Sequence, residues 1–215
     1  MSADPAPAVD APAGDLQRSS AFVGRAIGPI LAIAGSIACL AAIVLSVEKV
    51  RSLEDPSYVP SCSIDEVVSC GSVLVSEQAE AFGFPNPFIG IAGFAALATI
   101  GIVLIGGARL PRWLWLVIQG GVTLALGFVC WLIFQSVYRI EALCPYCMVV
   151  WVMTVVSFVY VTAHNIAEGR LGSGGQPGSA GIVVRYHGLI TTLLLLVIAT
   201  ILGQAFWDHW QRVLL

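Results

Sequence analysis

Charged residues are scarce in this chain: Asp, Glu, Lys and Arg together make up 11% of its 215 residues. Soluble domains carry about 25%. Hydrophobic residues account for 58%, and the mean hydropathy is +0.89. The composition therefore excludes an ordinary soluble domain and indicates an integral membrane protein. The formal net charge of -3 leaves no basic surface of the kind that binds nucleic acid, so we expect no nucleic-acid partner.

The first 22 residues lack the basic segment and the short apolar segment that mark a cleaved signal peptide. They are rich in Ala, Pro and Asp, and we expect residues 1–22 to form a disordered cytoplasmic tail. The stretch 168–181 is rich in Gly, Ser and Pro. It predicts a flexible cytoplasmic linker over residues 166–187.

Five apolar stretches approach the length of about 20 residues that a helix needs to cross a bilayer. They run over residues 27–47, 88–106, 114–138, 147–161 and 189–206, and the fourth is long enough when residues 144–146 and 162–164 are included. The predicted fold class is therefore an all-α integral membrane protein. Its parts would be a four-helix domain over residues 23–165 with a large loop over 48–86, a fifth transmembrane helix over 188–208 and a tail over 209–215.

Lys and Arg residues near the ends of these stretches predict the orientation, because they favour the cytoplasmic side. If the N-terminus is cytoplasmic, six of them lie inside: Arg18, Arg25, Arg109, Arg112, Arg170 and Arg185. Four lie outside: Lys49, Arg51, Arg139 and Arg212. This bias predicts a multi-pass protein of the inner (plasma) membrane, with the loop 48–86 and the C-terminal tail on the extracytoplasmic side.

Four of the six cysteines then fall on the extracytoplasmic side, where disulfides persist. Cys62 and Cys70 lie in the large loop, and Cys144-Pro145-Tyr146-Cys147 opens the fourth apolar stretch. Cysteines three residues apart fit the first turn of a helix, where exposed N–H groups and the helix dipole favour a reactive thiolate. The pattern indicates thiol-disulfide exchange.

The cysteines also admit other roles. Cys39 and Cys130 fall within apolar stretches, and Cys130 lies about 20 Å along a helix from Cys144, so we expect both to pack as small apolar side chains. Four thiolates can hold zinc, but Cys62 and Cys70 lack the close spacing of zinc ligands, and we predict no metal site. Two inert disulfides that staple loops are the stronger alternative to exchange.

Taken in order, these residues resemble the vitamin K epoxide reductase family in its bacterial branch. The resemblance covers about residues 27–164 and rests on Cys62 and Cys70 spaced eight apart, Ser76 six residues later, Asn86 and Phe88 at the entry to the second stretch, and the Cys-Pro-Tyr-Cys motif at 144–147. It implies a four-helix transmembrane bundle around a quinone, with the fifth helix at the periphery. Many members of that branch carry a fused thioredoxin-like domain, which these 215 residues do not contain, so the resemblance implies a separate redox partner.

The resemblance also implies a path for electrons. A DsbA-like thioredoxin-fold protein would pass electrons to Cys62 and Cys70, these to Cys144 and Cys147, and Cys147 would reduce a membrane quinone, either menaquinone or ubiquinone. The chain would then be a quinone-dependent oxidoreductase that reoxidises a disulfide catalyst. Two alternatives are flow in the opposite sense, as a dedicated quinone or epoxide reductase, and a non-catalytic membrane subunit with structural disulfides.

Seven residues are candidates for the quinone pocket: Ser76, Asn86, Phe88, Leu132, Ser136, Ile140 and Trp151. Asn86, between two prolines, is either a donor to a quinone carbonyl or an ordinary helix N-cap. Leu132, Ser136 and Ile140 recur every four residues and mark one helix face, which is either a ligand wall or plain packing. Phe88 and Trp151 would stack on the quinone ring or belong to the core.

Trp151 departs from the family pattern. Animal members usually have Tyr at this position, seven residues after the first Cys of the motif. An indole N–H donates a hydrogen bond but cannot accept one. The departure disfavours an epoxide as substrate and leaves quinone reduction, which can rely on Asn86, unaffected.

Overall fold

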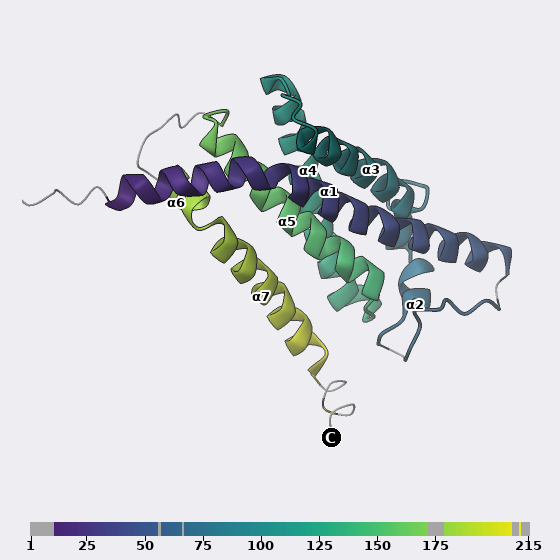
Figure 1. The fold of residues 1–215 in the computed structure, drawn as a ribbon. Coiled ribbons are helices and arrows are strands. Elements are labelled where there is room, and N and C mark those ends of the chain that lie inside the picture. Colours follow the sequence, from purple (N-terminus) through teal and green to yellow (C-terminus); the bar gives the residue numbers. More distant parts are fainter. Residues whose placement is uncertain (1–10, 56, 66, 172–178, 208–210, 212–215) are drawn as a thin grey trace, which may run out of the picture.

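The computed structural model describes residues 11–55, 57–65, 67–171, 179–207 and 211, and these are mainly helical (Figure 1). The elements are α1 (Ala11–Glu54), α2 (Cys70–Leu74), the 3-10 helix η1 (Glu77–Glu80), α3 (Asn86–Ile105), α4 (Arg112–Gln135), the π-helical turn η2 (Ser136–Ile140), α5 (Pro145–Ala167), α6 (Ser179–Arg185) and α7 (His187–Ala205). Within these ranges there is no strand, and five helices are long and apolar enough to cross a membrane. The predicted all-α membrane fold and the count of five spans are confirmed.

Two segments that were predicted to lack regular structure are partly helical. α1 begins at Ala11, so residues 11–22 belong to a helix, and the prediction of a disordered tail there is wrong. α6 forms inside the predicted linker 166–187. Contacts between distant segments explain both, since Arg185 of α6 donates to the Asp15 carboxylate of α1 at 3.1 Å, and Phe22 of α1 stacks on His187. Residues 1–10 and 172–178, and the predicted tail 209–215 apart from position 211, lie outside the described residues.

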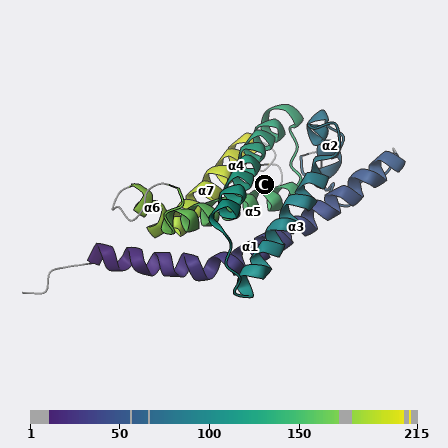
Figure 2. The same ribbon diagram turned by 90° about the horizontal axis from the view of Figure 1, so that it is seen from above.

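α1 is the longest helix and runs the length of the molecule along one side of it (Figures 1 and 2). α3 and α5 pack against it, and α4 packs against α5. The contact with α3 is close because Gly35 faces the backbone of Ala98 and Gly101 faces the backbone of Ala32, where a side chain on either glycine would collide. The 44 residues of α1 span about 66 Å at 1.5 Å per residue, against about 30 Å for a bilayer core. Part of α1 therefore extends beyond the apolar layer.

α7 lies at the edge of the molecule and diverges from α1 (Figure 1). None of its residues is buried. Ile198 and Leu202 pack on a cluster formed by Val129, Ile133 and Trp151 of α4 and α5. The fifth helix is thus peripheral, and α1, α3, α4 and α5 form the bundle that positions the cysteines.

Candidate active site of four cysteines and an apolar cavity

A disulfide joins Cys62 to Cys70 in the loop between α1 and α3, with their Cα atoms 5.5 Å apart. Cys70 is the first residue of α2, and Ser69 caps that helix by accepting a hydrogen bond from the Ser72 N–H. The loop folds over both sulfur atoms, so that Cys62 is only 7% exposed and Cys70 is fully buried. The disulfide therefore faces the interior of the protein.

A short parallel bridge joins this loop to the segment before α5. The Leu143 N–H donates to the Val67 carbonyl at 2.7 Å, and the Ser69 N–H donates to the Leu143 carbonyl at 3.0 Å. Cys70 and Cys144 are the next residues along the two paired segments, and their sulfur atoms lie 3.2 Å apart. Because exchange requires one sulfur to reach another, this contact can carry electrons between the two cysteine pairs.

Cys144 occupies the N-cap of α5 and Pro145 its first turn, so the motif opens a helix as its spacing predicted. The Cys147 N–H donates to the Cys144 sulfur at 3.4 Å. The hydrogen bond from the Cys147 thiol is the largest cause that lowers the pKa of Cys144; burial opposes it, and the N–H groups of Cys147 and Tyr146 add to it. These hydrogen bonds, first that of the Cys147 thiol, favour the Cys144 thiolate, which is the reactive form in exchange.

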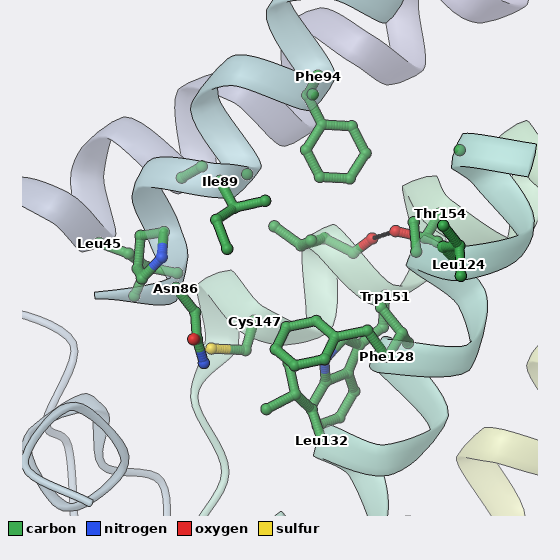
Figure 3. Close-up of a pocket in the computed structure, with 18 of the residues that line it drawn as sticks. Leu45, Asn86, Ile89, Phe94, Leu124, Phe128, Leu132, Cys147, Trp151 and Thr154 are labelled. Atoms are coloured by element: carbon green, nitrogen blue, oxygen red, sulfur yellow. Dashed lines mark hydrogen bonds between the residues drawn. The ribbon is translucent and has the colours of Figure 1, made fainter. Parts of the chain in front are cut away.

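An apolar cavity of about 670 Å³ lies beside the dithiol, between α3, α4 and α5 and below the loop (Figure 3). Sites for small molecules usually occupy roughly 300–1,000 Å³. Cys147 lines the cavity, whereas Cys144 does not and is buried against Cys70. The two cysteines of the motif therefore face different groups: Cys144 contacts the loop disulfide, and Cys147 faces the cavity.

All but one of the predicted pocket residues line this cavity: Ser76, Asn86, Leu132, Ser136, Ile140 and Trp151. The three that recur every four residues all line it, whereas their spacing alone left a ligand wall and plain packing open. Trp151 is also part of the core, since it packs on Val129 and Ile133. Both alternatives for Trp151, stacking on a ligand ring and packing in the core, thus fit its position.

Phe88 is the exception, and its predicted stacking role needs correction. Its side chain is 43% exposed and borders a surface depression with Val47 and Val50 of α1. Phe88 follows Asn86 by two residues, and such neighbours point about 200° apart around a helix. The same start of α3 that turns Asn86 into the cavity therefore turns Phe88 away from it.

Asn86 holds the loop over the cavity. Its side-chain N–H donates to the Gln78 carbonyl at 2.6 Å, and its side-chain oxygen accepts from the Ala81 N–H at 3.2 Å. Pro85 is the N-cap of α3, so the interpretation of Asn86 as an N-cap is wrong. A primary amide has two N–H donors, which leaves the second N–H of Asn86 for a ligand in the cavity that it lines.

Sequence reasoning missed several residues that enclose the cavity: Gln78, Ala79 and Phe82 around η1, Phe94 of α3 and Phe128 of α4. Phe128 had a usable signal, because it lies four residues before Leu132 and extends the same stripe. The residues around η1 had none, since irregular chain has no hydrophobic period from which a facing direction can be predicted.

The chain passes from α4 to α5 through η2 and Glu141, which has a left-handed backbone with φ of 55°. π-turns are rare and are found mostly at functional sites, and a positive φ is uncommon for Glu. The two features end α4 and redirect the chain, so that Leu143 pairs with the loop and Cys144 meets Cys70. The backbone route that brings the sulfurs together had no sequence signal.

The other two cysteines lie apart from this group. The Cys39 thiol donates to the Ile91 carbonyl at 3.9 Å between α1 and α3, and Cys130 is exposed on α4. Neither lines the cavity. The position of Cys39 between two helices agrees with the predicted packing role, whereas Cys130 is exposed on α4, and its predicted packing role is not seen within this chain.

Two cysteine pairs in sulfur contact, beside an apolar cavity inside a bundle of membrane-spanning helices, define an oxidoreductase of the thiol-disulfide class. Residues 29–162, more than half of the chain, match the model of the family described as "Vitamin K epoxide reductase family". The chain therefore belongs to the vitamin K epoxide reductase family. Members of this family are oxidoreductases that are associated with quinones and generally work with thioredoxin-like redox partners.

Proposed function

We propose that the chain is a quinone-dependent thiol oxidase of the inner membrane, which reoxidises a DsbA-like thioredoxin-fold protein on the extracytoplasmic side. One observation carries the proposal: the dithiol lies between the two groups that it would serve. The Cys144 sulfur is 3.2 Å from that of Cys70, while Cys147 lines the apolar cavity. Two purely structural disulfides would need neither the contact between the Cys70 and Cys144 sulfurs nor a cysteine at the cavity.

The catalytic cycle begins when the partner's two thiols reduce the Cys62–Cys70 disulfide and leave with a disulfide of their own. The Cys70 thiolate then attacks Cys144 of an oxidised motif and releases Cys147 as a thiolate. Cys62 next attacks Cys70 and releases Cys144, which restores the loop disulfide. The pairing in the structure, with Cys62 bonded to Cys70 and both motif cysteines free, corresponds to the stage that follows.

In the last step the dithiol gives two electrons and two protons to the quinone, which leaves as quinol, and a Cys144–Cys147 disulfide forms. The cavity suits such a substrate because its lining is mainly apolar and Asn86, a polar residue, lies beside Cys147 (Figure 3). The second N–H of Asn86 would donate to a quinone carbonyl there. An apolar tail would extend toward Ile100 and Leu114, which line the cavity between α3 and α4.

The second candidate, epoxide reduction with flow in the opposite sense, is less well supported by the same cavity. Trp151 lines it and offers a donor without an acceptor. A quinone carbonyl needs only donors, which both Asn86 and Trp151 can supply. We therefore propose quinone, of the menaquinone or ubiquinone type, as the electron acceptor.

Purified protein that is given a quinone and a reduced thioredoxin-fold protein is expected to form one quinol for each disulfide made in the partner. Quinone absorbance and alkylation of the partner's thiols would be followed together. The Cys144→Ala/Cys147→Ala variant supplies the background rate, because it keeps the loop disulfide and lacks the dithiol. Partner oxidation that is independent of quinone, or of the motif cysteines, would contradict the proposal.

The orientation has its own test. We expect a cysteine placed at Glu54, exposed at the end of α1, to react with a membrane-impermeant maleimide in intact cells. A cysteine placed at Ala108, exposed between α3 and α4, should react only after the cells are opened. These sites are better than Cys62 and Cys144, which are buried. The reverse labelling pattern would put the redox site on the cytoplasmic side.

A further inference from the structure

Two neighbouring charged residues near the end of α1 are buried: Glu48 and Lys49 are each 5% exposed. No other carboxylate, ammonium or guanidinium group is buried in the part of the chain that the structure describes. Burial of a charge is costly unless hydrogen bonds or an opposite charge compensate it. The contacts of these two side chains show what they hold in place.

Glu48 binds the part of the loop that carries Cys62. One of its carboxylate oxygens accepts from the Ser61 hydroxyl at 2.7 Å, and the other accepts from the Tyr58 hydroxyl at 2.8 Å. Ser61 immediately precedes Cys62. The carboxylate therefore fixes the segment that leads into the first loop cysteine, which we name the Cys62 arm (residues 57–63).

Lys49 binds the part of the loop that carries Cys70. Its ammonium donates to the Leu74 carbonyl at 2.7 Å and pairs with the Glu80 carboxylate at 2.9 Å. Leu74 is the last residue of α2, whose first residue is Cys70. A cation suits the carbonyl end of a helix. Lys49 therefore fixes the Cys70 arm, which we define as residues 70–80.

The two charges belong to one face of α1. Leu45 lies three and four residues before them, so the three side chains project in the same general direction. Leu45 packs in one cluster with Cys62, Cys70 and Cys144. This face of α1 therefore packs against the cysteines and, one turn further on, binds each of the two arms separately.

We propose that Glu48 and Lys49 are positioning residues, and that each controls one cysteine of the loop. Lys49 keeps Cys70 at exchange distance from Cys144. Glu48 keeps the Cys62 arm closed over the disulfide. The inference rests on the exchange step of the proposed function, but not on the identity of the quinone or of the protein partner, and it is tested without either.

The first measurement isolates the contact of Cys70 with Cys144. In the full chain with Cys62→Ser, Cys147→Ser, Cys39→Ala and Cys130→Ala, only these two thiols remain. The purified protein is equilibrated with reduced and oxidised glutathione, where one new disulfide forms as one oxidised glutathione becomes two reduced molecules. Alkylation with a polymer-linked maleimide then counts the free thiols and gives the equilibrium constant.

In this background Lys49→Met is expected to lower the equilibrium constant about tenfold or more, because Cys70 loses its fixed position. Met has a similar length and needs no partner, and Lys49→Arg, which keeps the charge, should recover part of the loss. Arg185→Met is the matched control, since it breaks an ion pair with Asp15 about 50 Å away along α1 and should leave the constant unchanged.

The second measurement isolates the Cys62 arm. With Cys62 as the only cysteine left in the chain, its rate of alkylation by a small maleimide reports how often the arm opens. Glu48→Gln is expected to raise this rate several-fold, while Lys49→Met should change it little. If the two residues only stabilised the fold, each substitution would change the equilibrium constant, the alkylation rate of Cys62 and the melting temperature together.

Three results would overturn the proposal. One is an equal equilibrium constant in Lys49→Met and Arg185→Met. Another is a Cys62 alkylation rate that Glu48→Gln does not change. A third is an equal effect of each substitution on both readouts, which would indicate general loosening of the loop. If Lys49→Met does not fold, Glu80→Gln serves as the test instead, because it weakens the same ion pair at an exposed carboxylate. It should lower the equilibrium constant of the Cys70–Cys144 disulfide two- to three-fold, and an unchanged constant would overturn the proposal.

Discussion

Replacing Cys144 by Ala is expected to reduce quinol formation by at least about a thousandfold and to leave a visible charge-transfer band between Cys147 and bound quinone. Cys147 lines the cavity, and Cys144, whose sulfur accepts from the Cys147 N–H at 3.4 Å, is the cysteine with which it would close a disulfide. Without Cys144, the Cys147 thiolate would persist beside an electron-poor ring. The band would be measured by absorbance of purified protein titrated with quinone.

Two variants define what the band means. Cys147→Ala removes the sulfur that faces the cavity and is expected to show neither the band nor turnover. Cys130→Ala changes a cysteine on the exposed side of α4 and should leave both the spectrum and the turnover as they are. If Cys144→Ala binds quinone without any change in absorbance, or if Cys147→Ala retains normal turnover, the assignment of Cys147 as the electron donor is wrong.

A substitution of Asn86 tests its proposed hydrogen bond to the quinone. Asn86→Ala, added to Cys144→Ala, should weaken the band, because a lost hydrogen bond to a buried carbonyl costs about 1 to 3 kcal/mol. The same change frees the Gln78 carbonyl and the Ala81 N–H, which Asn86 now binds. A higher quinone concentration should restore the band if affinity alone was lost.

The spans, the cysteine motif and most of the residues that line the cavity could be identified from the sequence because their signals are local. An apolar stretch predicts its own span, and Cys144-Pro145-Tyr146-Cys147 predicts its own helix start, which the structure confirms. The stripe of Leu132, Ser136 and Ile140 marked one face, since a helix repeats its facing direction about every four residues, and all three residues line the cavity. In each case, the residues of the pattern lie close together in the sequence.

The features that could not be predicted depend on contacts between distant segments. The direction in which the Phe88 side chain points depends on the residue at which α3 begins, because side chains two residues apart on a helix point to nearly opposite sides. The exchange of Cys70 with Cys144 was implied by the family resemblance alone, because their contact depends on the Leu143 bridge and on the backbone of Glu141, neither of which has a pattern in the sequence. In the sequence, Lys49 served only to predict the orientation in the membrane. Its role in the loop could not be predicted, because its partners Leu74 and Glu80 lie 25 and more residues away.

Replacing Cys62 by Ala is expected to separate the two sources of electrons. Turnover driven by a protein partner should fall by about a hundredfold or more, because the partner has no loop disulfide left to reduce. Turnover driven by a small dithiol should remain within a few-fold of the wild type. Cys70 lies 3.2 Å from Cys144, so it can still attack Cys144 in this variant. Without Cys62 to attack it in turn, the mixed disulfide Cys70–Cys144 accumulates. A small dithiol can reduce this mixed disulfide and so sustain turnover.

The mixed disulfide makes the outcome specific. Proteolysis without reduction, followed by mass spectrometry, should recover a peptide pair linked through Cys70 and Cys144 from the Cys62→Ala variant supplied with quinone. Cys39→Ala is the matched control, since its thiol donates to the Ile91 carbonyl between α1 and α3 and the residue does not line the cavity, so the change should not affect either electron source. Equal loss of both activities, with no linked peptides, would mean that Cys62 stabilises the loop and passes no electrons. A normal rate with the protein partner would mean that the partner reduces the motif directly.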